Sequence, residues 1–300
     1  MKGISTISID WEDFGQLFGK YHYGNITEPV NGTIERQTKI ILDLLDETDI
    51  KGTFFILGML AKYRKSLVKE IAARGHEIAL HGLNHKAMFT LTKEEAKADI
   101  EDSTKIISDI IGESLYGYRA PFFSIVKENI YLLETLSELG FLYDSSIFPV
   151  KLRRYGIAGF SEEDKKYILP NGKEIIELPN TIGNCMNKKW PVSGGGYIRL
   201  MPSFLIEKIY KKISDSGKDS MIYMHPYEFD SEKITVDSNY PEGVRYSKIK
   251  AAALNFRWNI FRPSITNKLR KLLMAHDFKT CLEKATFINN NSAASLLKIK

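Results

Sequence analysis

The residues of this sequence that could bind a metal ion and transfer protons fall into a few short clusters. His81-Gly82-Leu83-Asn84-His85 places two imidazoles four residues apart, so a helical turn or a tight loop could direct both at one cation. Asp10-Trp11-Glu12-Asp13 supplies three carboxylates. Two histidines and one carboxylate with open coordination positions are a catalytic pattern for zinc and similar ions. Glu12 and Asp13 are both candidates for the carboxylate ligand.

Each cluster also has a plainer interpretation. Two histidines four residues apart occur often by chance, as surface residues or as core residues with satisfied hydrogen bonds. Acidic residues can simply end a strand and cap the loop that follows it. An acidic motif of this kind could also hold the metal ion and nucleotide sugar of a glycosyltransferase. The clusters therefore have to be judged together with the elements that position them.

Short apolar stretches alternate with helical patterns along the first 145 residues and again near 221. We predict strands at about 4–9, 53–57, 76–80, 115–119, 141–144 and 221–224, and helices at about 33–48, 60–74, 92–111, 126–139 and 202–215. This order indicates βαβ units and a parallel sheet with both faces covered. In such folds the functional groups collect at the C-terminal ends of the strands. The residues predicted there are Asp10 to Asp13, His81 to His85, Arg119, Asp144 and His225.

The alternation breaks between about 148 and 200. Within this stretch Asn171-Gly172 lies between two apolar stretches, a signal for a hairpin with a type I′ turn. We interpret the whole chain, 1–300, as a single domain that carries an insertion at about 148–200.

Composition excludes several classes of protein. With 43% hydrophobic and 26% charged residues, the chain is not disordered, collagenous or a coiled coil. Its two cysteines, Cys185 and Cys281, cannot form a disulfide framework or a zinc finger. The apolar start ends at Asp10, too soon for a signal peptide, and no stretch of 18 apolar residues follows. We therefore expect a soluble cytoplasmic protein.

The net charge of +5 is too small to indicate nucleic-acid binding, but it is unevenly distributed. The segment 245–279 contains nine Lys or Arg and a single acid, Asp277, together with several aromatic and aliphatic residues. One interpretation is the solvated face of packed helices. The other is a surface that meets anionic lipid or a pyrophosphate-linked substrate, at the inner face of the cytoplasmic membrane.

Five short motifs together resemble a known family. Taken in order, the sequence resembles the five motifs of the NodB-homology polysaccharide deacetylases, carbohydrate esterase family 4, and the matches span residues 8–225. The matching segments are Ser8-Ile9-Asp10-Trp11-Glu12-Asp13, His81-Gly82-Leu83-Asn84-His85, Arg119-Ala120-Pro121-Phe122, Tyr143-Asp144-Ser145-Ser146 and Ile222-Tyr223-Met224-His225. The stretches 193–200 and 225–230 also look like the subfamily associated with bacterial exopolysaccharide and exosortase systems.

The resemblance implies a deformed (β/α)7 barrel with a helical C-terminal extension, one divalent metal ion and hydrolysis of an N-acetyl group on a sugar. Zn²⁺ is the expected ion, with Co²⁺ or Ni²⁺ as alternatives. By position in the motifs, His81 and His85 would be metal ligands together with Glu12 or Asp13. The first motif of the family usually has two adjacent aspartates. Strand alternation places Glu12 on the same side as Asp10 and slightly favours Glu12 over Asp13.

The same resemblance implies the remaining roles. Asp10 would be the general base, with Arg119 beside it, and His225 the general acid. Asp144 would orient His225 or Arg119. The backbone N–H of Phe122 would stabilise the oxyanion. Substrate-binding candidates around it are Pro121, Trp11 and Tyr227, although plain packing is the alternative for both aromatic residues.

The sequence thus predicts a metal-dependent N-deacetylase. Its substrate would be an N-acetylated glycan of the bacterial cell surface, or a nucleotide-linked or lipid-linked precursor of one. Alternatives within hydrolases are an amidohydrolase on a small molecule and a deformylase of a formamido sugar. Alternatives from other classes are a metal-dependent glycosyltransferase and a catalytically inactive glycan-binding module.

Overall fold

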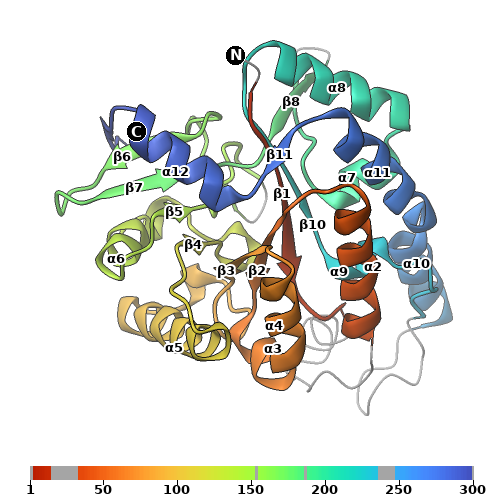
Figure 1. The fold of residues 1–300 in the computed structure, drawn as a ribbon, viewed down its shortest axis with the longest axis horizontal. Coiled ribbons are helices and arrows are strands. Elements are labelled where there is room, and N and C mark those ends of the chain that lie inside the picture. The colour runs from red at the N-terminus through yellow and green to blue at the C-terminus, as the bar shows by residue number, and fades with distance from the viewer. Residues whose placement is uncertain (1–2, 15–32, 153–154, 186–187, 236–246, 299–300) are drawn as a thin grey trace.

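A computed structural model of the chain has a sheet of parallel strands at its centre (Figure 1). It describes residues 3–14, 33–152, 155–185, 188–235 and 247–298. Seven strands run parallel, in the order β10 (Ser220–Met224), β1 (Ser5–Trp11), β2 (Thr53–Ile56), β3 (Glu77–Leu80), β4 (Gly117–Tyr118), β5 (Tyr143–Asp144) and β7 (Glu174–Glu177). The expected parallel α/β fold is confirmed.

The register of β1 brings the sequence motifs to one edge of the sheet. Every residue of β1 is buried, as expected for a parallel strand covered on both faces. Ile9 lies opposite Met224 of β10, and Asp10 lies opposite Phe55 of β2. The residues that follow β1, β3 and β10, namely Glu12, His81 and His225, therefore emerge at the same C-terminal edge.

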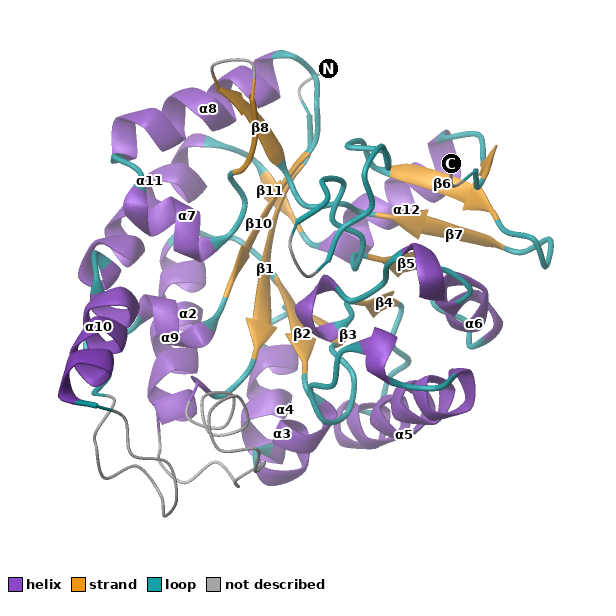
Figure 2. Cartoon of the chain, turned by 180° about the vertical axis from the view of Figure 1, so that it is seen from behind, coloured by secondary structure: helices purple, strands orange, loops and turns teal. Residues whose placement is uncertain are grey.

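Helices surround the sheet in both views (Figures 1 and 2). They include α2 (Thr33–Glu47), α3 (Gly58–Tyr63), α4 (Lys65–Ala73), α5 (Lys93–Ile111), α6 (Leu132–Glu138) and α8 (Ser203–Asp215). Helix α5 starts at a capping box between Thr92 and Glu95 and ends at Gly112, whose φ is 79°. The predicted helix over 92–111 is confirmed.

Two other predicted helices are divided. The segment expected as one helix over 60–74 forms α3 and α4, which meet at Arg64 with φ −130° and ψ 41°. No proline or glycine marks this break, and Arg64 forms an ion pair with Glu35 of α2. The segment expected as a helix over 126–139 begins with a 3₁₀ turn, Lys127–Asn129, before α6.

The stretch expected as an insertion, about 148–200, needs a correction because part of it belongs to the sheet. Strand β6 (Lys165–Ile168) forms an antiparallel hairpin with β7, and β7 pairs in parallel with β5. The chain then crosses to the opposite edge, where the Met221 N–H donates to Thr181 Oγ1 (2.6 Å) and the Tyr223 N–H donates to the Ser193 carbonyl (2.9 Å). These contacts link the two sides of the open sheet into a deformed barrel. A separate hairpin, β8 (Ile182–Cys185) and β9 (Lys188–Pro191), lies within the crossing.

The predicted β6–β7 hairpin is confirmed, but its turn is not type I′. A type I′ turn needs positive φ at both central residues, whereas only Gly172 has it, at 77°. The Gly172 N–H donates to the Leu169 carbonyl (2.9 Å) and the Leu169 N–H to the Lys173 carbonyl (2.8 Å). Pro170 fixes its own φ near −65°, which suits the first central position of a type I turn followed by a glycine bulge.

The C-terminal part returns along the outside of the barrel. It contains α10 (Lys248–Asn259), α11 (Ile265–Ala275), β11 (Phe278–Lys279), α12 (Cys281–Asn291) and β12 (Ser295–Leu296). Strand β11 pairs with Ser5 and Thr6 of β1. Cys281 is fully buried, and burial raises the pKa of its thiol to about 12. No helix in the described parts of the chain is long and apolar enough to cross a membrane.

Candidate metal and proton-transfer site

Glu12, His81 and His85 bring one ligand atom each to a common point at the C-terminal edge of the sheet. Glu12 Oε1 lies 2.8 Å from His81 Nε2 and 2.7 Å from His85 Nε2. Their ligand atoms all lie within 4.8 Å of one another, and all three side chains are buried. The structure thus supports the expectation of Glu12 as the third ligand. Asp13 is also buried but does not belong to this group, which corrects the alternative assignment.

The donor set fits a divalent metal ion. One carboxylate oxygen faces two imidazole nitrogens, the combination that zinc and related ions take. His81 Nδ1 lies 2.7 Å from the Arg119 carbonyl, which holds Nδ1 as the donor and leaves Nε2 as the ligand atom. Burial raises the pKa of Glu12, but His85 and His81 outweigh it and hold this pKa well below its usual range. Glu12 is therefore an anion, as a ligand must be.

The loop between the two histidines is held in an uncommon backbone conformation. Gly82 and His85 both have positive φ, 76° and 50°. The Leu83 N–H donates to Asp99 Oδ1 of α5 (2.8 Å), and the Gly58 N–H at the start of α3 donates to the Gly82 carbonyl (2.9 Å). A non-glycine residue with positive φ carries strain that the surrounding contacts must overcome, and it is often found at functional sites. The loop is thus anchored to two helices so that both imidazoles face Glu12.

Asp10 forms a buried ion pair with Arg119, as the sequence predicted. Arg119 Nη1 lies 2.6 Å from Asp10 Oδ1, and both side chains are almost completely buried. The guanidinium also donates to Ser8 Oγ (2.9 Å) and Ser145 Oγ (3.0 Å) and lies 4.0 Å from the ring centre of Phe55. Residues from several strands therefore hold Arg119 in one orientation, and Arg119 in turn orients Asp10.

His225 is paired with Glu228, a residue to which the sequence analysis gave no role. Glu228 Oε2 accepts the His225 backbone N–H at 2.9 Å and lies 3.4 Å from His225 Nδ1. Burial lowers the pKa of His225, but Glu228, Glu12 and Asp10 together raise it to about 9. His225 Pro226, with Glu228 three residues on, is the signature of a capping box with proline at the first position of α9 (Pro226–Phe229). This spacing could have identified Glu228 from the sequence.

The glycine stretch at 194–196 makes room for this pair. It forms the N-cap and first residues of α7 (Gly195–Leu200). A Cβ at Gly195 would lie 2.0 Å from Glu228 Oε2, so a larger residue would displace the carboxylate. Gly195 therefore permits the close approach of α7 to Glu228.

Asp144 is not paired with His225 or Arg119, which corrects the role predicted for it. Its carboxyl accepts from Ser146 N (3.1 Å) and Ser146 Oγ (2.5 Å), and it lies opposite Glu177 of β7. Burial raises the pKa of both carboxyls, and the neighbouring Asp144 raises that of Glu177 further. Ser146 Oγ also accepts the Ala120 N–H (2.7 Å). Ser146 therefore links the Asp144 carboxyl to the loop that begins at Ala120.

That loop carries Pro121 and Phe122. Pro121 is buried, and a Cβ at Gly82 would meet its ring at 3.5 Å, so the two loops pack closely. Phe122 and Phe123 have positive φ, 61° and 51°, and the Phe122 ring lies 4.3 Å from the His85 ring. The side chain of Phe122 therefore packs against His85, and its backbone has a strained conformation of the kind that is often found at functional sites.

The two aromatic residues named as substrate platforms lie in the interior. Trp11 is fully buried, and its indole N–H donates to Thr38 Oγ1 (2.9 Å), so it is a core residue. Tyr227 is also buried, with its ring centre 5.7 Å from that of His225. Packing, the alternative considered for both, is what the structure shows. Tyr227 supports the His225 ring and does not form an open surface.

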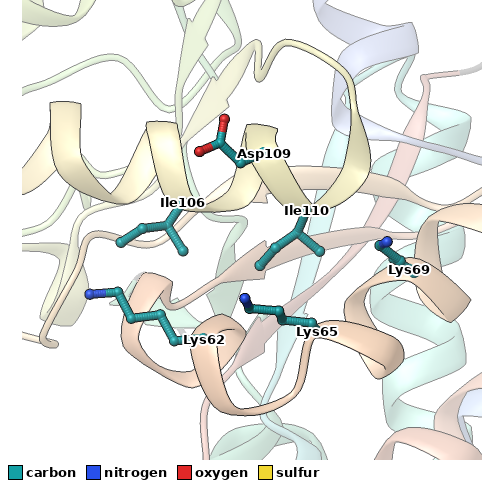
Figure 3. A pocket seen from close by; sticks show the side chains of 6 residues that line it. All are labelled: Lys62, Lys65, Lys69, Ile106, Asp109 and Ile110. Carbon is teal, nitrogen blue, oxygen red and sulfur yellow. The ribbon is translucent and has the colours of Figure 1, made fainter.

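A surface hollow lies away from this site. It has a volume of about 520 Å³, lies between α3–α4 and α5, and is lined by Lys62, Lys65, Lys69, Ile106, Asp109 and Ile110 (Figure 3). None of these residues belongs to the motifs or to the C-terminal edge of the strands. The chemistry-bearing side chains gather at the strand ends instead.

Comparison with known proteins gives two family matches. Residues 30–143 match the model of the family described as "Polysaccharide deacetylase", and residues 145–285 match that of a "Domain of unknown function (DUF3473)". The first covers the histidine loop, Arg119 and the loop after it. The second covers His225 and Glu228.

Several curated relatives with similar sequences are named deacetylases, which are hydrolases of amide bonds. Chitin deacetylase 1 of Cryptococcus neoformans is 34% identical over 85 residues, 28% of this chain and 18% of the relative. Peptidoglycan-N-acetylmuramic acid deacetylase PdaA of Bacillus subtilis is 25% identical over 132 residues, 42% of this chain and 49% of the relative. The chitooligosaccharide deacetylase of Sinorhizobium fredii is 30% identical over 86 residues, 28% of this chain and 40% of the relative. The chain thus spans less than half the length of each of these three relatives.

Solved structures share the fold over nearly the whole chain. A Mycobacterium smegmatis protein described as a polysaccharide deacetylase has a TM-score of 0.62 at 19% identity, covering 99% of this chain and 94% of its own. The allantoinase PuuE has a TM-score of 0.61 at 15% identity, covering 96% and 90%. At these identities the likeness concerns the fold alone, and the fold is that of the NodB-like deacetylases. The sequence is thus similar to polysaccharide deacetylases over residues 30–143, and the chain shares their fold over nearly its whole length.

Proposed function

We propose that this protein is a metal-dependent hydrolase that removes the N-acetyl group from an amino sugar. One observation carries the proposal: the Glu12–His81–His85 group lies at the strand edge that also bears the Asp10–Arg119 pair and the His225–Glu228 pair. Amide hydrolysis requires a base for the attacking water, an acid for the departing nitrogen and stabilisation of the oxyanion. The three groups match these requirements in number and in kind.

Asp10 is the proposed base. The charge-assisted hydrogen bond from Arg119 holds the Asp10 carboxyl in position to accept a proton from water. Because Arg119 is fully buried and bonded to several partners, the Asp10 carboxylate has one fixed orientation. A fixed base is effective because little reorganisation is needed when the water attacks.

His225 is the proposed acid. Its raised pKa of about 9 keeps the imidazole protonated at neutral pH, so it can give a proton to the departing amine. A quarter of its side chain is exposed, unlike the other site residues, which leaves it accessible to a substrate. Glu228 fixes the Nδ1 side of the ring and leaves Nε2 for the substrate.

Glu12, His81 and His85 would hold the metal ion, for which we propose Zn²⁺, with Co²⁺ or Ni²⁺ as alternatives. A divalent ion there would supply Lewis acidity towards the amide carbonyl and lower the pKa of water. The backbone N–H of Phe122, in the loop beside His85, is the proposed protein donor to the oxyanion.

The finer part of the proposal concerns the substrate and its location. The relatives are named for chitin, peptidoglycan and chitooligosaccharides, all of which contain N-acetylated sugars. We propose a bacterial surface polysaccharide, of the exopolysaccharide or exosortase-associated kind, or its nucleotide-linked or lipid-linked precursor, handled at the inner face of the cytoplasmic membrane. The stretches 193–200 and 225–230 support this subfamily, and Gly195 and Glu228 bring them together next to His225.

The test measures acetate release from N-acetylated glycans and from lipid-linked and nucleotide-linked N-acetyl sugars. The metal-free protein should be inactive and should recover activity with Zn²⁺. Asp10→Asn should reduce kcat by about 10³-fold, the contribution of general base catalysis, while the protein still binds the metal. Formate release instead would indicate a deformylase, and consumption of the nucleotide sugar a glycosyltransferase. Tight glycan binding without any release would indicate a binding module.

A further inference from the structure

Helix α10 presents an apolar stripe to solvent. Ile249 and Phe256, two helical turns apart, are 83% and 70% exposed, and the alanines at 252 and 253 between them are also exposed. Residues spaced by three, four and seven lie on one face of a helix. In a globular protein such a stripe normally faces the core, whereas no other element that the structure describes buries Ile249 or Phe256.

The opposite face of α10 provides the packing against the protein. Ala251 is buried, and Trp258 contacts Phe14 and Tyr227, with ring centres 4.9 Å and 5.7 Å apart. Arg199 of α7 donates to the carbonyls of Arg257 and Trp258 at 3.1 Å and 3.2 Å. The helix is therefore docked through its inner face, and its outer apolar stripe is not needed to hold it in place.

Basic residues border the exposed stripe, and α10 contains no acid. With 100° between successive residues, Lys248 lies along one side of the stripe and Lys250 and Arg257 along the other; all three are exposed. Phe261, just beyond the helix, is 56% exposed. Two other cations of the 245–279 segment form hydrogen bonds within the protein. Arg262 donates to the carbonyls of Tyr227 and Asp230. Lys268 donates to the carbonyls of Arg199 and Met201. Arg245 lies outside the described residues.

We propose that the outer face of α10 docks on an anionic phospholipid bilayer. An apolar stripe with aromatic residues enters the boundary between headgroups and acyl chains, and basic residues at its borders contact the lipid phosphates. The charge pattern selects this partner: cations on both sides of the stripe, without an acid on the helix, match a surface that is negative everywhere. Helix α10 lies at the edge of the molecule in both views (Figures 1 and 2), and Ile249 and Phe256 are exposed on it.

Docking through α10 would bring the candidate site close to the membrane. One aromatic contact joins Trp258 to Tyr227, and a second joins Tyr227 to His225, with ring centres 5.7 Å apart in each case. If the proposed function holds, this placement suits a substrate whose sugar is attached to a membrane lipid through an anionic link. Membrane binding itself is a property of α10 and is independent of the reaction.

The test is sedimentation of the full-length protein with vesicles of phosphatidylcholine alone or with 30% phosphatidylglycerol. We expect binding to the anionic vesicles, little binding to the neutral ones, and release as salt is raised. Lys248→Gln with Arg257→Gln should weaken binding by on the order of 20-fold, since each basic side chain contributes about fivefold. Ile249→Ser with Phe256→Ser should weaken it by about tenfold or more by removing the inserted stripe.

Two control variants test whether charge or exposed apolar area outside α10 also contributes to vesicle binding. Lys62→Gln with Lys65→Gln removes two cations from the hollow of Figure 3, and Phe287→Ser removes a 49% exposed ring from α12. Both should bind anionic vesicles like the unchanged protein. Equal binding to both kinds of vesicle, no binding at all, or equal losses in the controls and the α10 variants would overturn the proposal.

Acetate release from a soluble N-acetyl sugar distinguishes the two proposals. The α10 variants should release acetate from the soluble sugar like the unchanged protein. With an N-acetyl sugar anchored in anionic vesicles, they should release acetate more slowly than the unchanged protein does. Loss of release from the soluble substrate together with intact vesicle binding would contradict the proposed function and leave the docking surface standing. Intact release without vesicle binding would contradict the docking surface and leave the proposed function standing.

Discussion

The base side of the site, named for the proposed base Asp10, and the acid side, named for the proposed acid His225, are built differently. Asp10 is held by Arg119, 109 residues away, through a network that includes Ser8 and Ser145. His225 is held by Glu228, three residues away on the same short helix. The base side thus depends on the register of several strands, whereas the acid side depends on one helical turn.

The two sides of the site differ in how much they also contribute to the stability of the fold. Arg119 is fully buried, so breaking its contacts leaves unpaired charge in the interior. His225 is a quarter exposed, so water can replace a lost partner on that side. Substitutions on the base side should therefore damage stability and chemistry together, whereas those on the acid side should damage chemistry alone.

The proposed metal ligands give the largest expected effect. Glu12→Gln removes the only anion of the group and should reduce both metal content and acetate release by at least about 10³-fold. Asp13→Asn, the adjacent carboxylate outside the group, should keep the metal. Metal content is measured after dialysis against trace Zn²⁺. Retention of metal by Glu12→Gln with loss in Asp13→Asn would reverse the assignment.

Arg119→Lys tests the coupling of fold and chemistry on the base side. Lysine keeps the charge but cannot reach Asp10, Ser8 and Ser145 at once, so we expect a loss of about 3 kcal/mol in unfolding free energy. Activity should fall as well because Asp10 loses its orientation. Denaturant unfolding and acetate release measure the two losses. A stable but inactive variant would mean that Arg119 serves the reaction alone.

Glu228→Gln tests the acid side with a change of one atom. The amide oxygen can still accept the His225 N–H, but the negative charge beside the imidazole is lost. We expect kcat to fall about 10- to 100-fold with unfolding free energy almost unchanged. His225 must be protonated to act as an acid, and losing the anion lowers its pKa, so the alkaline limb of the pH–rate profile should move to lower pH.

Glu101→Gln on the surface of α5 is the control for this variant. Glu101 is half exposed and pairs with Lys97 of the same helix, so its loss should change neither kcat nor the pH profile. A drop in kcat for Glu228→Gln without a shift of the alkaline limb would mean that Glu228 only supports the packing of α7.

Most of the fold and much of the site follow from local patterns. The alternation of strands and helices predicts the parallel sheet, and the motif positions predict the metal ligands and the Asp10–Arg119 pair. The partner of Asp144 does not follow from such patterns, because it depends on which strand lies beside β5. That strand, β7, comes from the stretch interpreted as an insertion. Trp11 shows the same limit, since the face on which it lies depends on α2 packing against β1 through Thr38.

Asp144 and Glu177 offer a third arrangement, in which two carboxyls face each other. Glu177 Oε1 accepts the Ile147 N–H (2.9 Å), whereas Glu177 Oε2 meets no donor among the described residues. Its neighbour Asp144 is an acceptor too, so a proton between the two carboxyls resolves the conflict, and burial favours it by raising both pKa values. We therefore expect the two carboxyls to share a proton in the folded protein.

Glu177→Gln should therefore give the smallest effect. It should raise the melting temperature, whereas the other variants should lose stability or activity. In the unfolded chain Glu177 ionises near its ordinary pKa, whereas the folded chain retains the proton, so stability falls as pH rises above that ordinary value. Glutamine cannot ionise and can donate to Asp144, so the melting temperature at pH 8 should rise by about 2 °C and depend less on pH. Glu174→Gln on the same strand, which only breaks an ion pair with Lys166, should not raise it. A lower melting temperature for Glu177→Gln across the pH range would mean that the carboxylate is ionised in the fold and has a partner that stabilises its charge.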